Sequence, residues 1–558
     1  MPNKLSQFWQ ELKRRKVIKV LFMYAGAAIV LIGLASDVAG PLNLPDWAPR
    51  LIIILVIIGF PIAMVLSWIF DITPEGINRT TALEHSNMNE ARVSNQKSNF
   101  KGSIAVLPFQ DMSQQKDQEY FCEGMAEELI NALTKVGSLQ VASRTSAFQF
   151  KGKGYDIGKI GKELNVYSVL EGSIRKAGNK LRITAQLINV SDGYHLWSEK
   201  YDRDMEDIFA IQDEISLAIV DNLKVKLLRG EKEKLVERHT ENKEAYNLHL
   251  KGRYFWNRRS EVGFNKAFEF FQSAIEIDPL FALPYIGIAD TYNIIGHFCF
   301  IPPTEAFEKA RAAATKALEI DKNLSEAHAS MAWIHTYYDR NWKLAEKEYK
   351  LSIDLNPEYA SAHEWLALFL VGMGRFDEAI TEINKAIELD PLSVMISSIL
   401  GIVLYFSRRF EEAIEQFRKT LEMNPNFPFA HIWQGLSYLE IAAHDKALVS
   451  LMKSEALAKD MTYGLGILGM VYALADQNNK ALEILEKMEK LSETKYLSPL
   501  YKAFIFMGLG NKDKAFTYID KAFIEREPFL FYLKTVPTFD SLRSDPRFTE
   551  LLNKIGFV

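Results

Sequence analysis

Two long stretches without charged residues stand out near the start of the chain. Val20 to Ser36 has no charged residue in 17 positions, and Leu51 to Phe70 has none in 20. A helix needs roughly 17–25 apolar residues to cross a bilayer, so both stretches are long enough. Gly40-Pro41 between them is typical of a turn. The pattern predicts two transmembrane helices, at about 17–38 and 51–70, joined as a hairpin.

The basic residues beside these stretches set the expected orientation. Residues 1–16 include Lys13-Arg14-Arg15-Lys16, whereas the connecting loop has only Arg50. Because cytoplasmic flanks carry an excess of Lys and Arg, we expect a multi-pass protein of the bacterial inner (cytoplasmic) membrane, with both termini and the soluble domains cytoplasmic. A cleaved signal peptide is the alternative, since Ala35 and Ala39 are small residues near a possible cleavage site.

Residues 71–101 are mostly polar, with too few apolar side chains to form a core, which indicates a linker. The pattern then changes to that of a small α/β domain. Ile104 to Phe109 is a short apolar run, as expected of a buried strand. Leu181 to Val190 alternates as a half-buried strand does, and apolar residues from Ile208 to Leu223 recur at helical spacing. We assign residues 102–230 to this domain.

A different period governs the second half of the chain. A ladder of alanines recurs with steps of 43 and 35 and then 34 residues. Three glycines precede members of the ladder by 12 positions. Small residues at these spacings allow the two helices of a hairpin to pack closely, and a period of 34 is typical of tetratricopeptide repeats (TPRs). The predicted structural repeat positions are Ala267, Ala310, Ala345, Ala379, Ala413, Ala447, Ala481, Ala515, Gly401, Gly435 and Gly469.

About eight such hairpins are expected over residues 244–528. The 43-residue step implies about nine extra residues, which we place near Gly296 to Pro303. This apolar loop would either touch a partner or fold back onto its own repeat. Residues 529–558 follow the last ladder position and are expected to form the end cap that a solenoid needs.

Charge and candidate chemistry narrow the function classes. The net charge of −5 in 558 residues argues against a nucleic-acid partner. Cys122 and Cys299 are far apart and outside any metal-ligand spacing. Gly152 and Gly158 have five residues between them where a phosphate loop needs four, and His363-Glu364 lacks the second histidine of a zinc-protease helix. We therefore predict no catalytic, cofactor-binding or metal-binding residue, no cofactor and no enzymatic activity.

Several segments resemble a known family. Ser103 to Phe109, Glu171 to Arg175 and Leu196 to Arg203 are similar to the TolB/FlgO-type amino-terminal domain. With Phe8 to Arg15 and Thr73 to Gly76, the chain resembles bacterial membrane-anchored proteins that carry this domain before TPRs. Some relatives also carry a class III nucleotide cyclase or a DNA-binding winged helix. We expect neither here, because the predicted spans run almost directly into the α/β domain.

The expected fold class is thus multidomain: a two-helix transmembrane hairpin, a small α/β domain and an all-α TPR solenoid. The leading functional hypothesis is a membrane-anchored cytoplasmic scaffold or adaptor in bacterial signalling or assembly. It would bind a protein or peptide in the concave TPR groove and the lipid bilayer through its two helices. The alternative, implied by the resemblance, is a sensory or regulatory subunit of a separately encoded nucleotide cyclase, kinase or transcription factor. An enzyme is the third hypothesis. The sequence leaves the partner and the oligomeric state open.

Overall fold

The computed structural model describes residues 70–73, 76–79, 102–178, 180–204, 207–225, 227, 232, 235, 238–458 and 462–557. The chain divides into two compact units, Met1–Ser98 and Asn99–Val558. In the first unit, strand β1 (Phe70–Thr73) pairs antiparallel with β2 (Gly76–Arg79), with Phe70 opposite Arg79.

The predicted transmembrane hairpin requires correction. Among the helices of the described ranges, none has the length and apolar character needed to cross a membrane. The longest of these helices, α13 (Pro303–Ile320), has 18 residues and carries the exposed ion pair Lys309–Glu305. Residues 17–38 and 51–69 lie outside the described residues, and Phe70, predicted to end the second span, begins a strand instead. The fold class that included this hairpin, the multi-pass inner-membrane localisation and the bilayer as a partner are therefore not supported.

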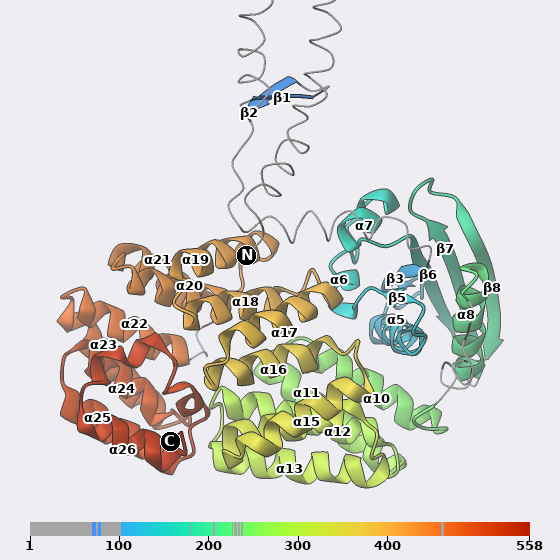
Figure 1. Ribbon diagram of the computed structural model, residues 1–558. Helices are drawn as coiled ribbons and strands as arrows, with labels where there is room; N and C mark the ends of the chain where they lie inside the picture. Colours follow the sequence, from blue (N-terminus) through green and yellow to red (C-terminus); the bar gives the residue numbers. More distant parts are fainter. Residues whose placement is uncertain are drawn as a thin grey trace, which may run out of the picture. The chain divides into compact units, whose positions relative to one another are not determined.

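The second unit begins with a mixed sheet in the strand order β5-β3-β6-β7-β8, with β4 paired to β6 (Figure 1). β3 lies parallel to β5 and β6, whereas β6, β7 and β8 are successive antiparallel neighbours. A tight turn between β6 and β7 gives them ten paired positions, from Ser168↔Asn189 to Ala177↔Lys180. The strands are β3 (Ser103–Val106), β4 (Gln110–Asp111), β5 (Gln140–Val141), β6 (Ser168–Ala177), β7 (Lys180–Asn189) and β8 (His195–Asp204).

Alternation along the strands distributes apolar side chains to the two faces of this sheet. Ile104 and Val106 of β3 join one buried cluster with helices α5 (Glu119–Thr134) and α8 (Ile208–Asn222). Ala105, between them, joins a second cluster with Ile160 and Leu164 of α7 (Ile157–Leu164). The short helix α6 (Arg144–Phe148) begins where Ser143 Oγ accepts the backbone N–H of Ser146. We call residues 102–225 the α/β module.

The rest of the second unit consists of helices that pair as successive hairpins from α10 to α25 (Figure 1). Side-chain caps begin several of them; Asn341 and Asn511, for example, accept backbone N–H groups of the first turn. We call this series the TPR array. Its helices besides α13 are α10 (Lys243–Trp256), α11 (Glu261–Ile277), α12 (Ala282–His297), α14 (Ser325–Ile334) with the π-helical turn η2 (His335–Asp339), α15 (Trp342–Leu355), α16 (Ala360–Gly372), α17 (Phe376–Leu389), α18 (Val394–Phe406), α19 (Phe410–Met423), α20 (Pro428–Glu440), α21 (His444–Leu457), α22 (Thr462–Leu474), α23 (Asn478–Ser492), α24 (Pro499–Gly508) and α25 (Lys512–Ile524).

The chain then continues through two 3₁₀ turns, η3 (Pro528–Tyr532) and η4 (Pro537–Leu542), to the helix α26 (Pro546–Ile555). This stretch includes the residues predicted as a terminal cap. Its apolar side chains belong to the same buried cluster as the helices from α12 to α25. We call residues 527–542 the return segment, because they turn back onto the array.

Candidate functional site

The predicted repeat positions lie at the contacts between helices. Each ladder alanine is on the second helix of its hairpin, and all eight are 0% exposed. A Cβ atom added to Gly401 would lie 2.6 Å from Phe417, and one added to Gly435 would lie 2.7 Å from Leu451. A Cβ on Gly469 would lie 2.7 Å from Ile505, on the next hairpin. These distances leave no room for a side chain at the three glycines. That the small repeat residues are needed for stability stays a prediction.

The inner face of the array is formed by the first helices of the hairpins, and the return segment lies on it. Phe531 stacks on Phe369 of α16 with 6.0 Å between ring centroids, and Tyr532 contacts Phe406 of α18 at 5.1 Å. Further along, Phe539 contacts Phe504 of α24 at 5.8 Å. Phe531, at 2% exposure, and Phe539, at 0%, are as inaccessible as core residues. In the described structure, the chain itself therefore fills the groove where we expected a partner.

Polar contacts fix the position of the return segment. Tyr532 and Tyr337 of η2 share a buried hydrogen bond between their hydroxyls. The Tyr405 hydroxyl lies 3.1 Å from Thr538 Oγ1, and Arg408 Nη1 lies 2.7 Å from Asp540 Oδ2. Tyr337 belongs to the hairpin of α14 and α15, and Tyr405 and Arg408 belong to the hairpin of α18 and α19, so the segment crosses several repeats instead of covering only the last one.

The irregular loop after α12 contacts the return segment and other repeats. The Cys299 thiol donates to Glu527 Oε1 at 3.7 Å. The Tyr501 hydroxyl of α24 donates to the carbonyl of Phe298 at 3.3 Å, and the Phe298 ring lies 6.0 Å from that of Phe429 on α20. Neither sequence-based alternative described this arrangement, in which the loop reaches distant repeats of its own chain.

Burial dominates the chemistry of this region. It raises the pKa of Glu527 to about 7, although the backbone N–H of Phe529 and the Cys299 thiol favour the ionised form. Burial also raises the pKa of Cys299 well above its ordinary value. A thiol that stays protonated is a poor nucleophile, so Cys299 packs as an apolar residue.

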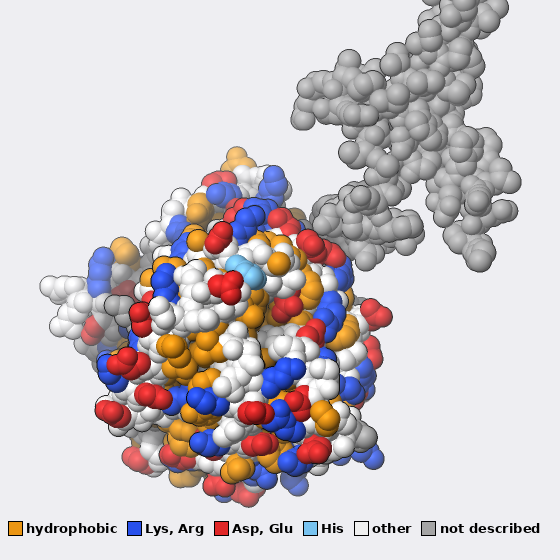
Figure 2. All heavy atoms as spheres, turned by 90° about the vertical axis from the view of Figure 1, so that its left-hand side faces the viewer, with side chains coloured by type: hydrophobic (Ala, Val, Ile, Leu, Met, Phe, Trp, Pro, Cys, Tyr) orange, Lys and Arg blue, Asp and Glu red, His pale blue; other side chains and the backbone are white. Residues whose placement is uncertain are grey.

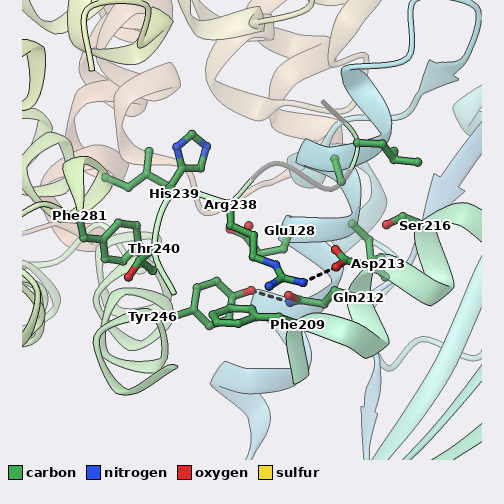
Figure 3. Close-up of a pocket in the computed structure, with 14 residues that line it drawn as sticks. Glu128, Phe209, Gln212, Asp213, Ser216, Arg238, His239, Thr240, Tyr246 and Phe281 are labelled. Carbon is green, nitrogen blue, oxygen red and sulfur yellow. Dashed lines mark hydrogen bonds and ion pairs between the residues drawn. The ribbon is translucent and has the colours of Figure 1, made fainter. Parts of the chain in front are cut away.

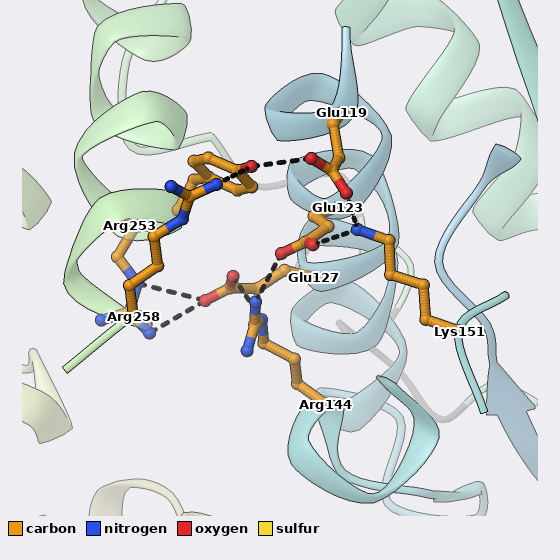
Figure 4. A network of polar contacts seen from close by, with 8 residues as sticks. Glu119, Glu123, Glu127, Arg144, Lys151, Arg253 and Arg258 are labelled. Carbon is orange, nitrogen blue, oxygen red and sulfur yellow. Dashed lines mark hydrogen bonds and ion pairs between the residues drawn. The ribbon is translucent and has the colours of Figure 1, made fainter. Parts of the chain in front are cut away.

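A second cluster joins the α/β module to the first TPR hairpin (Figure 4). Glu119, Glu123 and Glu127 follow one another at intervals of four and thus share a face of α5. Glu127 Oε1 lies 2.9 Å from Arg253 Nη2 of α10, and its Oε2 lies 2.8 Å from Arg144 Nε of α6. Burial raises the pKa of Glu127, but the charges of Arg253 and Arg144 outweigh it and hold the pKa at about 2.

The α/β module and the TPR array contact each other at two further points. The Tyr254 hydroxyl of α10 donates to Glu119 Oε2 at 2.8 Å. Ser146 of α6 donates to Asp390 Oδ1 at 2.5 Å and accepts the backbone N–H of Leu392 at 2.7 Å. The module is therefore held at α10 and again at the turn between α17 and α18, and the seven helices α11 to α17 lie between these two places in the sequence.

A small cavity of about 60 Å³ lies between α5, α8 and α10 (Figure 3). Gln212 donates to the Tyr246 hydroxyl at 2.5 Å, and Arg238 forms an ion pair with Asp213. These four polar side chains of the wall thus already pair with one another. Binding sites for drug-sized ligands are typically 300–1,000 Å³, so this cavity has room for water rather than for a cofactor.

Other surfaces and clusters offer less. Within the described ranges, no group of three or more His, Cys, Asp or Glu side chains could hold a metal ion. On the face formed by the last hairpins, hydrophobic side chains are exposed among charged ones (Figure 2). In the last hairpins, Val449 and Met452 of α21 and Leu482 of α23 are 68%, 52% and 51% exposed.

Sequence reasoning missed both clusters. The return segment carries a signal that could have been noticed, since Pro528 to Tyr532 combines proline with three aromatic residues. The acidic interval of four on α5 was also visible. Neither pattern predicts which residues it contacts, because Arg253 is 126 residues from Glu127 and Tyr337 is 195 residues from Tyr532.

Comparisons with known families match two parts of the chain. Residues 100–218 match the second domain of HilA/YgeH-like transcriptional regulators. Residues 335–394 and 400–464 match the tetratricopeptide repeat. The resemblance of the module to the TolB/FlgO-type domain is not shown by these matches and stays a prediction.

One curated relative is the "Putative adenylate cyclase 3" of Rhizobium meliloti (strain 1021), 39% identical over 234 residues. The match covers 42% of this chain and 40% of the relative, so the chain spans well under half of that protein. Another, "Tetratricopeptide repeat protein 6" of Homo sapiens, is 28% identical over 124 residues, which are 22% of each chain.

Two solved structures are similar to part of this chain. One, from a study of Pseudomonas aeruginosa PilF, is 22% identical and covers 37% of this chain and 93% of that chain, with a TM-score of 0.28. The other, a tetratricopeptide repeat protein from Parabacteroides merdae, is 16% identical and covers 48% and 100%, with a TM-score of 0.35. Because residues 335–394 and 400–464 match the tetratricopeptide repeat, the carboxy-terminal region of this chain contains tetratricopeptide repeats.

Proposed function

We propose that this chain is a protein-interaction scaffold whose TPR array binds partner segments on its inner face. The observation that carries this proposal is the return segment itself. The inner face buries Phe531, Tyr532 and Phe539 and pairs Arg408 with Asp540. It thus has pockets for aromatic side chains and a cation for an acidic one, arranged along several repeats.

The chemistry of the internal segment defines the expected partner. Such a partner would present a short stretch of aromatic and leucine side chains in tight turns, followed by a carboxylate that reaches Arg408. Because the return segment belongs to the same chain, its effective concentration at the groove is high, of the order of mM for short linkers. A partner therefore competes best after the segment is released or replaced.

Cleavage of the connection tests this proposal. We would insert a specific protease site after Ile524, which is 76% exposed, and cut the purified full chain. A fluorescent peptide with the sequence of residues 525–545 should then exchange into the groove, and a matched peptide with Phe531→Ala and Phe539→Ala should exchange at least about tenfold more weakly. Equal exchange of the two peptides, or no exchange in a cut chain that keeps its helical circular-dichroism spectrum, would contradict the proposal.

The second candidate is a regulatory subunit. It is favoured by the match of residues 100–218 to a domain of transcriptional regulators and by the relative named as a putative adenylate cyclase. Because these matches cover only parts of the proteins concerned, they support the class and not an activity. The purified chain should leave ATP unchanged in the presence of Mg²⁺ or Mn²⁺. Formation of cyclic AMP that scales with the amount of the chain would instead make it an enzyme.

A further inference from the structure

Strand β8 is the last strand in the order of the sheet. One edge pairs with β7, from Lys180↔Asp204 to Ile188↔His195. Within the described part of the chain, no strand pairs with its other edge. An edge of ten residues offers a row of backbone N–H and C=O groups to which another strand can add.

The charges along β8 are self-complementary. Glu199-Lys200-Tyr201-Asp202-Arg203 reads acid, base, tyrosine, acid, base. When two copies pair antiparallel with Tyr201 opposite Tyr201, Lys200 of each copy faces Asp202 of the other. In the same register, Glu199 of each copy faces Arg203 of the other. Opposite charges at directly paired positions stabilise an antiparallel pair, and like charges destabilise it.

These side chains are accessible for such pairing. Lys200, Asp202 and Arg203 are 51%, 54% and 45% exposed. Their contacts within the chain are at the surface: Arg182 Nε lies 2.6 Å from Asp202 Oδ1, and Arg203 Nη2 lies 3.9 Å from Glu214 Oε2 of α8. Exposed pairs of this kind contribute about 0–1 kcal/mol, so a second copy can share or replace them at little cost.

The buried residue of the strand fixes which face each charge occupies. Tyr201 is 3% exposed and belongs to the cluster beneath α5 and α8. Because side chains alternate along a strand, Glu199 and Arg203 share the face of Tyr201, whereas Lys200 and Asp202 lie on the opposite face. Arg182 of β7 is opposite Asp202, so it adds a further charge to the face that carries Lys200 and Asp202. The ion pairs of a dimer would thus be divided between both faces of one continuous sheet.

Charged edges usually protect a sheet from pairing, since like charges on two copies repel. The order of signs here has the opposite effect in the antiparallel register. We propose that the outer edge of β8 is a homodimerisation surface, on which a second copy of this chain pairs antiparallel about Tyr201. A twofold dimer would bring two TPR arrays into one assembly, and the inference is independent of what each array binds.

Sedimentation of the full chain at a series of concentrations tests the proposal, with two single variants. Glu199→Arg places Arg opposite Arg203 of the second copy, and Arg203→Glu places Glu opposite Glu199. By symmetry each variant creates two like-charge contacts, so the dimer Kd should rise about tenfold or more in both. Glu411→Arg, at an exposed position on α19, is the matched control and should leave the Kd unchanged.

Mixing the two variants distinguishes loss of pairing from damage to the fold. A heterodimer of one Glu199→Arg copy and one Arg203→Glu copy restores an opposite charge at each of these contacts, so the mixture should dimerise as the unmodified chain does. The double variant should also recover, since both charges are reversed within each copy. A monomeric unmodified chain over the whole concentration range, or a mixture that dimerises no better than the single variants, would overturn the proposal.

Discussion

Glu127 and Glu527 are two glutamates, each buried at a contact between distant parts of the chain. Their surroundings shift their pKa values in opposite directions. Glu127 is 8% exposed and lies between two arginines, so that it is held ionised with a pKa of about 2. Glu527 is 2% exposed beside Cys299, and burial raises its pKa to about 7. The carboxyl group between the module and the array is thus ionised at neutral pH, whereas burial among mostly apolar contacts favours the neutral form of the carboxyl group on the return segment. The two should therefore respond in opposite directions to pH.

The apolar contact should give the largest loss when one side chain is truncated. Phe531→Ala removes a ring that contacts Phe369, Tyr337 and Tyr532, and it leaves a cavity in a region that cannot collapse easily. We expect a loss of about 3–5 kcal/mol in the free energy of unfolding, measured by urea denaturation. Ile524→Ala, at a site that is 76% exposed, is the control and should cost less than about 0.5 kcal/mol. A similar result for both variants would place Phe531 outside the core.

The ionic contact should give the next largest effect. The folded-state pKa of Glu127 lies below its ordinary value of 4.5, so its contribution is present above pH 4.5 and is lost as the pH falls toward 2. Glu127→Gln should therefore cost roughly 3 kcal/mol at pH 7, at about 1.4 kcal/mol per pKa unit, and much less at pH 3. Urea denaturation of both proteins at the two pH values measures this. An equal difference at the two pH values would contradict an ionised, paired Glu127.

Glu527 should show the reverse slope. Its pKa in the folded state lies above 4.5, so its contribution is greatest below pH 4.5 and is lost as the pH rises through about 7. Removing this one ionisation should flatten the stability profile between pH 5 and pH 8 by roughly 2 kcal/mol. Glu527→Gln is the variant and Glu411→Gln, at an exposed site, is the control. If the profile of Glu527→Gln matches that of the unmodified chain, the carboxyl group is not buried as described.

The packing within the hairpin of α18 and α19 involves neither the contact at Glu127 nor the contact at Glu527, so it provides a reference for the loss of stability. Gly401→Ala places a Cβ 2.6 Å from the Phe417 ring, so α18 and α19 must separate or the ring must move. We expect a loss of roughly 2 kcal/mol in thermal or urea unfolding. Ser492→Ala, at the end of α23, is the control for a helical substitution without a clash. No loss at Gly401 would mean that the small residue is not required for packing.

Local patterns predicted local structure well and distant contacts poorly. The strand expected at 181–190 differs by only one residue from β7, Lys180–Asn189, because the alternation of apolar and polar residues marks it locally. The alanine period located the hairpins for the same reason, since it reflects contacts within 34 residues. The return segment has no period and depends on surfaces contributed by several hairpins. The sequence-based prediction for Phe70 failed because hydrophobicity alone does not separate a helix from a strand at the end of an apolar run.

The π-helical turn at the end of α14 accounts for an irregularity in the ladder. The step from Ala310 to Ala345 is 35 residues, one more than each of the five steps that follow. A π-helical turn takes in one residue more than an α-helical turn, so His335–Asp339 absorbs the surplus within the helix. An insertion of one residue during the evolution of the repeats would thus have been accommodated without shifting any later hairpin. The same turn contains Tyr337, whose hydroxyl shares a hydrogen bond with that of Tyr532.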